Sequence, residues 1–278
     1  MKESLSVRLL YQTTLGRGIL KFLVQPKISK MAGRFLDSKC SCFIIPHFIK
    51  KNNIDMSDVL IPEGGFSSFN EFFCRKRKQD YAQFDKDKVI SPCDAFLTCI
   101  PIKKDSVFDV KHTKFSLDDM LGDEKLAQEF EDGYAFVFRL TPTHYHRYAY
   151  PACGKVVRAK RISGILHCVR PIVTRQIPIY TQNTREYQVI RTKEFGKIIQ
   201  MEVGALLVGR ITNHDIRKNR LVKAGQEKGY FEFGGSTIIL LFQKDKIKPC
   251  SEFAGKDEAD VRLGMPIAEM FRRRCQQS

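Results

Sequence analysis

The amino-acid sequence predicts an α+β fold in which a helical, basic N-terminal region lies on a β-rich core of sandwich or barrel type. Two observations support this prediction. Apolar residues recur at three- and four-residue steps near the N-terminus, and runs rich in Val, Ile, Leu and Phe follow from about residue 86. A turn-rich connector lies between them. We therefore expect residues 1–85 to form a helical region with its connector, and residues 86–278 to form the core.

The N-terminal region combines helical periodicity with positive charge. A first helix is expected over 5–23 and a second over 28–48, with a break at Pro46. Residues 1–53 hold ten Lys and Arg against two acidic residues, a net charge of +8. Basic amphipathic helices either lie in a membrane interface or pack on a core with a solvated basic face. The pattern by itself favours neither alternative.

The remaining elements are expected from turn signals and apolar runs. The connector holds a turn cluster at 62–68, and a short helix that ends in basic residues follows at 69–78. In the core, Ser116 can cap one helix that extends to Phe130, and a last short helix is expected from Pro266. The expected strands are 87–91, 96–102, 134–140, 155–161, 187–192, 197–203, 205–212 and 237–243.

Composition limits the function classes. The chain has 278 residues and a mass of 32.0 kDa, with 43% apolar and 28% charged residues, which is typical of a folded protein rather than a disordered one. Its net charge of +16 indicates an anionic partner, such as nucleic acid, a membrane or a phosphorylated substrate. No run of 18 apolar residues predicts a transmembrane helix. The nine scattered cysteines include no CxxC pair, which favours reduced thiols over a zinc site.

Three short stretches could carry chemistry. Gly234, Gly235 and Ser236 separate a Phe-rich run from an apolar strand. A bare Gly-Gly-Ser is usually a turn, but a serine after glycine can also attack the preceding carbonyl where the backbone is strained and a base is near. His144 and His146 are two of only six histidines, and in an extended segment both would face the same side.

The third stretch is the turn at 91–94, which ends in Asp94. An aspartate in a turn is usually a turn former, but together with a histidine and a serine it could orient a base. The histidine pair has no third cluster of metal ligands, so no metal site is expected.

In this order, the stretches resemble the phosphatidylserine decarboxylase family, and in particular its bacterial branch whose proenzymes carry GGST. The likeness extends over most of the chain, and the ordered set is specific even though GGST alone is weak. The matching segments are SFNEFF at 68–73, SPCD at 91–94, YHRY at 145–148, NTREY at 183–187, VGALLVG at 203–209, KGYF at 228–231 and GGST at 234–237.

The resemblance implies a self-processing enzyme. Family members cut their own chain before the serine of this motif, which is the Gly235–Ser236 bond here. The pieces 1–235 and 236–278 would stay together, and Ser236 would become a pyruvoyl group, the only cofactor. Its ketone would form a Schiff base with the amine of phosphatidylserine, lose CO2 and yield phosphatidylethanolamine. The resemblance implies a peripheral enzyme on the cytoplasmic side of the cell membrane.

Roles for the named residues follow from the same resemblance. Ser236 is the nucleophile of self-cleavage, which needs a positioned base. We expect His146 to donate the proton that completes decarboxylation, and Asp94 to orient the self-cleavage base. The residues that hold the headgroup are left open, with Arg75, Arg147 and Arg185 as candidates by charge alone.

One position departs from the family pattern. The common pattern is His-Arg-x-His, and its second histidine serves self-cleavage, whereas this chain has Ala149 there. The base is therefore unassigned: His146 could serve both steps, or His144 or His167 could replace it. Ala95 also stands where the family has glycine.

Two other functions compete with this one. Because of Ala149, the chain could be an inactive membrane-associated homologue. A basic module that binds nucleic acid is disfavoured, since the charge gathers on a helical stretch and the strands lack an RNP-like aromatic signature. We expect phosphatidylserine and an anionic membrane surface as partners and no nucleic acid, and we leave a homodimer open.

Overall fold

The computed structural model describes several stretches of the chain. These are residues 13, 15–16, 18–19, 25–78, 84–104, 107–110, 113–167, 179–205, 210–233 and 236–272. The first expected helix, over 5–23, lies mostly outside the described residues.

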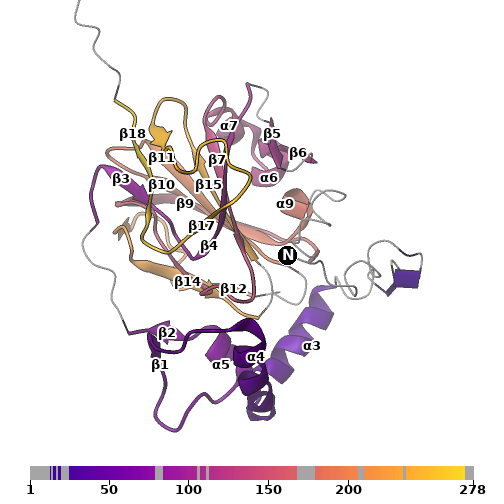
Figure 1. The fold of residues 1–278 in the computed structure, drawn as a ribbon. Helices are drawn as coiled ribbons and strands as arrows, with labels where there is room; N and C mark the ends of the chain where they lie inside the picture. The colour runs from indigo at the N-terminus through magenta and orange to yellow at the C-terminus, as the bar shows by residue number, and fades with distance from the viewer. Residues whose placement is uncertain are drawn as a thin grey trace, which may run out of the picture.

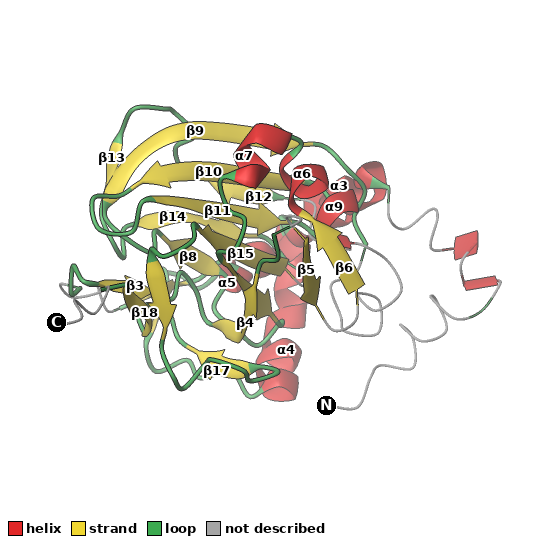
Figure 2. Cartoon of the chain, turned by 90° about the horizontal axis from the view of Figure 1, so that it is seen from above, coloured by secondary structure: helices red, strands yellow, loops and turns green. Residues whose placement is uncertain are grey.

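An eight-stranded antiparallel sheet forms the centre of the fold (Figure 1). Its strand order is β13–β9–β10–β11–β15–β7–β4–β17, and every neighbouring pair is antiparallel. Figure 2 shows β9, β10, β11 and β15 following one another across this sheet. The strands are β4 (Ala95–Pro101), β7 (Tyr134–Leu140), β9 (Gly154–Ile162), β10 (Arg185–Arg191), β11 (Lys197–Val203), β13 (Leu221–Val222), β15 (Ser236–Phe242) and β17 (Ala259–Val261).

Strand β15 shows why the sheet is stable. All seven of its residues are buried, and their side chains alternate between two hydrophobic clusters on opposite faces of the sheet. Ile239 and Leu241 belong to one cluster, and Ile238, Leu240 and Phe242 belong to the other. Because both faces are covered, the strand is a continuous apolar run, which is the pattern that predicts a buried strand.

Helices cover the first face, and smaller sheets cover the second. The helices α6 (Leu117–Leu121), α7 (Glu124–Gln128) and α9 (Ile179–Gln182) contribute to the cluster of Ile239 and Leu241. The hairpin of β5 (Val107–Val110) and β6 (Thr113–Ser116) adjoins them. The other cluster is covered by β12 (Ile211–Asn213), β14 (Glu227–Phe231) and β8 (Arg147–Ala149), and by β16 (Ile247–Pro249), β18 (Pro266–Met270) and β3 (Lys88–Ile90).

The helical region packs against the end of β14. It contains α3 (Pro26–Leu36), the 3-10 helix η1 (Lys39–Phe43), α4 (Ile44–Asn52), α5 (Phe69–Phe73) and the strand pair β1 (Val59–Leu60) and β2 (Lys76–Arg77). Ser68 caps α5, since its hydroxyl accepts a hydrogen bond from the Glu71 amide at 3.1 Å. The three phenylalanines of α5 form a cluster that includes Tyr230 and Phe233 of the core. The division between 85 and 86 stays a prediction.

The α+β class with its β-rich core is confirmed, but several local predictions differ from the structure. The short helix predicted at 69–78 ends at Phe73, and Lys76–Arg77 form strand β2 instead. The second helix is interrupted after Leu36 rather than at Pro46, which lies in the first turn of α4, where a proline costs no helical hydrogen bond. The helix expected from 117 to 130 is two helices, because Gly122 adopts a left-handed conformation at φ 56° and ends α6.

A further difference concerns the C-terminal end of the described chain. The helix predicted from Pro266 is the strand β18, which pairs with both β16 and β3. Proline is tolerated at the first position of a strand, and pairing with two neighbours outweighs the helical pattern of the apolar residues. The strand predicted at 205–212 is found only as β12, and residues 206–209 are not described.

Candidate active site

Ser236 begins the central strand β15 with its side chain enclosed. It pairs with Leu140 of β7, and none of its surface is exposed. Its hydroxyl has no hydrogen-bond partner among the described residues, although buried hydroxyl groups are nearly always paired. Gly234 and Gly235 lie outside the described residues, so the chain before Ser236 is described up to Phe233.

His146 is buried beside the segment that leads to Ser236. Its Nδ1 lies 2.9 Å from the carbonyl oxygen of His144, which fixes the proton on Nδ1 and makes Nε2 the acceptor atom of the neutral ring. Its ring lies against that of Phe73, with the centroids 4.0 Å apart, and its own carbonyl oxygen accepts from the Phe231 amide at 3.0 Å. Helix α5 thus contacts the imidazole, and strand β14 holds the main chain of His146.

His144 is a neutral histidine that stabilises a turn. Its Nδ1 accepts a hydrogen bond from the Thr141 amide at 2.9 Å, and its Nε2 lies 3.9 Å from Oδ1 of Asp260. Burial lowers its pKa, and the negative charges of Asp94 and Asp260 oppose this effect only in part. The proton of the neutral ring is therefore on Nε2.

Asp94 is held by an arginine and a main-chain amide. Its carboxylate forms an ion pair with Arg77 and accepts from the Leu263 amide at 2.9 Å. Arg77 also pairs with Asp58 at 3.1 Å, and its guanidinium lies over the ring of Tyr145, 4.3 Å from the centroid. That Asp94 orients a self-cleavage base stays a prediction.

Ala149 adjoins the turn that carries Asp94. Its amide donates to the carbonyl oxygen of Pro92 at 2.8 Å, and its buried methyl group belongs to a small cluster with Tyr145 and Leu263. The position that carries the second histidine of the family pattern is therefore next to Asp94, but a methyl group cannot accept a proton. His167, another alternative, lies between β9 and α9, where Asn183 binds its main chain and burial lowers its pKa.

The three arginines proposed by charge all have internal contacts. Arg185 donates to the carbonyl oxygens of Met120, Asp119 and Asn183, so it fixes the C-terminal end of α6. Arg147 donates to the carbonyl oxygen of Cys74 at 2.7 Å and forms an ion pair with Glu227 at 2.6 Å. Arg75 is buried over the Phe72 ring.

A cavity of about 710 Å³ opens beside the end of β14. Its walls come from α3, β9, β10 and β12, and Glu232 and Phe233 line it one to two residues before the glycine pair. Arg210 pairs with Glu232 at 3.2 Å, and Arg161 pairs with Glu186 at 3.1 Å. Sequence reasoning missed these residues, although Arg210 directly follows the VGALLVG segment. The basic residues of the lining are Arg34, Lys160, Arg161, Arg210 and Lys218.

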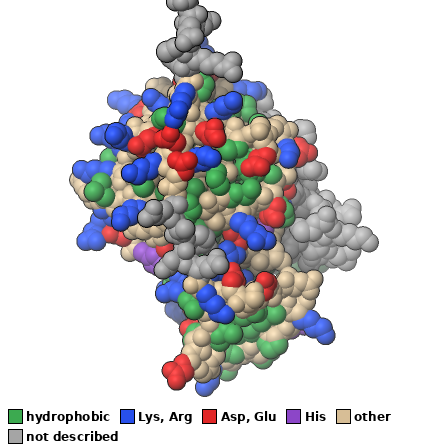
Figure 3. All heavy atoms as spheres, turned by 60° about the vertical axis from the view of Figure 1, so that its left-hand side comes forward, with side chains coloured by type: hydrophobic (Ala, Val, Ile, Leu, Met, Phe, Trp, Pro, Cys, Tyr) green, Lys and Arg blue, Asp and Glu red, His purple; other side chains and the backbone are tan. Residues whose placement is uncertain are grey.

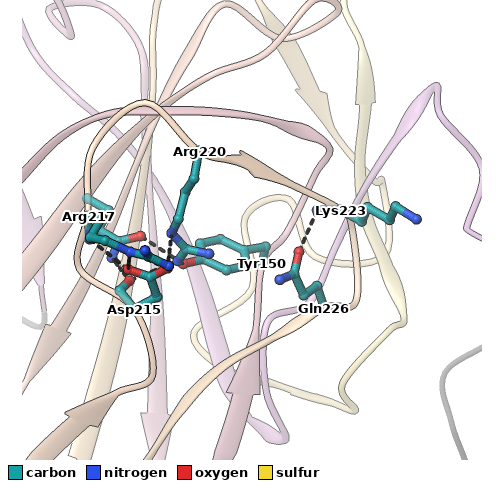
Figure 4. A network of polar contacts seen from close by, with 7 residues as sticks. Tyr150, Asp215, Arg217, Arg220, Lys223 and Gln226 are labelled. Carbon is teal, nitrogen blue, oxygen red and sulfur yellow. Dashed lines mark hydrogen bonds and ion pairs between the residues drawn. The ribbon is translucent and has the colours of Figure 1, made fainter.

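A polar network fixes the loop that forms one wall of the cavity (Figure 4). Arg220 donates to the carbonyl oxygen of Asp215 at 2.8 Å and also contacts the hydroxyl of Tyr150. Arg217 forms an ion pair with the Asp215 carboxylate at 2.8 Å. The side-chain Nε2 of Gln188 on β10 donates to the same Asp215 carbonyl oxygen at 3.0 Å, which ties the loop to the central sheet.

Two charged residues to which the sequence analysis gave no role are fully buried behind this cavity. Nζ of Lys228 on β14 forms an ion pair with Oε2 of Glu202 on β11, and both side chains have an exposed fraction of 0%. Lys228 also donates to Oδ1 of Asn213 at 3.1 Å, and the side-chain Nδ2 of Asn213 donates to the Glu186 carboxylate at 2.9 Å. Lys228 begins the KGYF segment at 228–231, whereas the signal for Glu202 was a charged residue within an apolar strand.

Comparisons with known proteins agree with one another. A family model described as phosphatidylserine decarboxylase matches residues 69–269. The chain is 40% identical over 266 residues to phosphatidylserine decarboxylase proenzyme 2 of Clostridium acetobutylicum, covering 95% of this chain and 90% of the relative. It is 37% identical over 277 residues to the phosphatidylserine decarboxylase proenzyme of Chlamydia muridarum, covering 96% and 92%.

Proposed function

Because the chain belongs to the phosphatidylserine decarboxylase family, we propose that it cuts itself between Gly235 and Ser236 and then decarboxylates phosphatidylserine. The observation that supports the cut most directly is the Ser236 hydroxyl, which is buried at the start of β15 and has no partner in the described part of the chain. A hydroxyl that no hydrogen bond restrains is suited to attack the carbonyl group before it.

The cut is an isomerisation followed by an elimination. Ser236 Oγ attacks the Gly235 carbonyl carbon, and the peptide C–N bond breaks to leave an ester and a free amine. A base then removes the α-hydrogen of Ser236, and the carboxylate of Gly235 leaves with the ester oxygen. Water converts the resulting dehydroalanine to a pyruvoyl group and ammonia. Each proton transfer needs a positioned group.

The residues around Ser236 suit this group. The Ser236 side chain is buried, and so is His146, whose ring lies against Phe73 of α5 and whose carbonyl oxygen accepts from Phe231 of β14, the strand that precedes Ser236. Once formed, the pyruvoyl group supplies a ketone that bonds the substrate amine and accepts the electron pair released as CO2 leaves. In this proposal, His146 delivers the proton that completes the reaction at the former α-carbon of the substrate.

The cavity beside Phe233 is our candidate for the headgroup site. Its five basic side chains attract the phosphate and carboxylate groups of phosphatidylserine, and Glu186 and Glu232 can face the ammonium group. Its volume of about 710 Å³ is in the ordinary range for small-ligand sites.

We also propose that the helical region meets the membrane. Among the described residues, no helix is long and apolar enough to cross a bilayer. Seven of the ten exposed large hydrophobic side chains in the described chain belong to this region, namely Leu15, Ile19, Met31, Phe35, Phe43, Leu60 and Ile61. In Figure 3 the helical region is at the bottom, as in Figure 1, and hydrophobic side chains gather on it with Lys and Arg side chains around them. Apolar side chains among basic ones are suited to an anionic lipid surface.

Intact-mass measurement of the purified protein tests the proposed cut. We expect two chains, of which the smaller spans the 43 residues from 236 to 278 and has a mass of about 5 kDa. It should be lighter by one ammonia than the same peptide with an N-terminal serine. Ser236→Ala should give only the intact 32.0 kDa chain and no release of CO2 from phosphatidylserine.

The same experiment decides the alternative that Ala149 motivates, an inactive membrane-associated homologue. An intact wild-type chain that binds lipid vesicles but releases no CO2 would establish that alternative. An intact chain that still decarboxylated phosphatidylserine would contradict the proposed mechanism.

A further inference from the structure

Glu202 lies on the same face of the central sheet as Ser236. Residue 202 of β11 pairs directly with Ile238 of β15, and Ser236 is two positions before Ile238 on the same strand. Side chains two apart on a strand share a face, and directly paired residues do so as well. Glu202 and Ser236 are therefore diagonal neighbours, a relation that brings Cβ atoms to within roughly 7–8 Å and within reach of long side chains.

Both side chains carry a buried oxygen that lacks a partner. Within the described chain, no hydrogen bond is made by Oγ of Ser236 or by Oε1 of Glu202, and both residues have an exposed fraction of 0%. The other carboxylate oxygen, Oε2, is held by Nζ of Lys228 and by the side-chain Nδ2 of Asn213, which is 3.4 Å away. One oxygen of this carboxylate is thus anchored while the second is not. Unpaired buried side-chain oxygens are rare, and they also occur at Gln200 on β11 and at Thr237 on β15. Of these four residues, however, only Glu202 and Ser236 place a carboxylate and a hydroxyl group on the same face of the sheet.

We propose that Glu202 is the base for self-cleavage in this chain, with Lys228 as the positioning residue that keeps its carboxylate charged. The inference rests on the proposed cut at Ser236. Oε1 takes the hydroxyl proton as Oγ attacks the Gly235 carbonyl carbon. The same proton then passes to the Ser236 nitrogen as the C–N bond breaks. Glu202 returns to its charged form, so the step needs no co-reactant.

Electrostatics supports this role. Burial raises the pKa of Glu202, and the positive charge of Lys228 opposes that rise. Burial likewise lowers the pKa of Lys228, and Glu202 opposes that change. A carboxylate out of water is a stronger base than an exposed one, provided that a cation keeps it ionised. The titratable groups that face Glu202 are Lys228 from β14, Glu186 from β10, Tyr148 from β8, Tyr150 just after β8 and Cys93 before β4.

The first test removes the charge of Glu202 and keeps its shape. The full-length chain is synthesised in a cell-free system, and the uncut fraction is followed on a denaturing gel. Glu202→Gln should slow cutting by about 100-fold or more, the usual contribution of a general base. The matched control is Glu258→Gln, which removes a carboxylate paired with Arg139 at 2.9 Å. Arg139 on β7 stands directly opposite Thr237 of β15, so its side chain projects from the face of the sheet opposite Ser236. The control should therefore cut at the wild-type rate.

The second test is a pH profile that a purely structural role would not shift. In Lys228→Met the carboxylate loses its cation, so its pKa rises and the cutting rate should fall at neutral pH and recover at higher pH. The double variant with Glu202→Gln should stay slow at every pH. Thermal unfolding establishes which variants fold. If Glu202→Gln does not fold, the pH profile of Lys228→Met decides whether Glu202 is the base.

The outcomes separate this inference from the proposed function. If folded Glu202→Gln cut at the wild-type rate, or if the Lys228→Met profile matched that of the wild type, Glu202 would not be the base, although the proposed cut would stand. An intact wild-type chain would overturn both the cut and its base.

Discussion

At the scale of single residues, hydrogen bonds distinguish the two neighbouring histidines. The main-chain amide of Thr141 occupies Nδ1 of His144, whereas the carbonyl oxygen of His144 accepts from Nδ1 of His146. The two rings are therefore in opposite tautomers although they are two residues apart. Only His146 lies against α5 and the end of β14, close to the chain that leads to Ser236.

The lowered pKa of His144 predicts sensitivity to acid. The folded protein holds this ring neutral, whereas the unfolded chain takes up its proton near pH 6.5. The unfolded state therefore binds more protons, and the free energy of unfolding falls as pH drops below about 6.5. We expect His144→Asn, which keeps an acceptor for the Thr141 amide, to lose less stability than its parent between pH 7 and pH 5.

Urea midpoints measured across this range check the prediction. The uncut Ser236→Ala chain is the parent, so that a single polypeptide unfolds. His47→Asn, at an exposed position on α4, serves as the control and should leave the pH dependence unchanged. Equal slopes for His144→Asn and its parent would contradict the assignment of a neutral His144.

At the scale of elements, α5 connects the helical region to the catalytic core. Its Phe73 contacts both His146 and Phe233. Its Asn70 side chain donates to Asp37 at 2.8 Å and accepts from the Phe233 amide at 3.3 Å. One short helix thus positions the imidazole, the entrance of the chain to Ser236 and the end of α3.

Replacing the bridging side chain should loosen these elements. Asn70→Ala, in the uncut Ser236→Ala background, leaves the Phe233 amide without its acceptor. We expect a loss of about 1–3 kcal/mol in the free energy of unfolding, the usual cost of an unsatisfied buried group. Urea unfolding measures this loss. Asn52→Ala removes a bond within a single helix, from its side chain to the Phe48 carbonyl at 2.8 Å, and should cost less. A larger loss for Asn52→Ala would argue against the bridge.

The strands that sequence reasoning found are those whose own residues determine them. The expected strands 134–140 and 197–203 coincide with β7 and β11, and 237–243 differs from β15 by one residue. Two- and three-residue strands such as β13 and β17 were missed, because pairing with a longer neighbour creates them. β18 was predicted as a helix because its pairing with β16 and β3, which are distant in the sequence, leaves no local signal.

The residues of the candidate site also fall into two groups, those that the sequence could indicate and those that depend on the fold. Ser236, His146 and Asp94 stand in recognisable segments, so the sequence could point to them. Glu202 could not be assigned to the site, because the pairing of β11 with β15 decides which face its side chain shares with Ser236. Lys228 stands in the KGYF segment, but its ion pair with Glu202 follows only from the fold. The cavity was missed because its walls come from elements far apart in the sequence.

At the scale of the whole molecule, charge and exposed apolar surface define how it would meet a membrane. In the proposed function, the net charge of +16 would attract the chain to anionic lipid, and the exposed side chains of the helical region would offer apolar surface for insertion. Phe43 is 74% exposed within η1.

Vesicle binding tests this arrangement. Phe43→Glu should weaken co-sedimentation with vesicles containing phosphatidylglycerol by about tenfold, because burying an aromatic side chain is worth roughly 1.5–3 kcal/mol. Leu221→Glu is the control, since Leu221 is 80% exposed but lies on the edge strand β13 of the core. Equal losses for both variants would indicate that charge alone governs binding. Wild-type binding should also weaken as salt is raised.

The position of β15 has a consequence for the proposed cut. A break just before Ser236 would place a new chain end in the middle of the eight-stranded sheet, because β15 lies between β11 and β7. Hydrogen bonds along both edges would keep the short polypeptide in register, so the two products could separate only if the sheet itself came apart. Maturation would thus double the number of polypeptides without creating a second folding unit, and neither product made alone should reach the native structure.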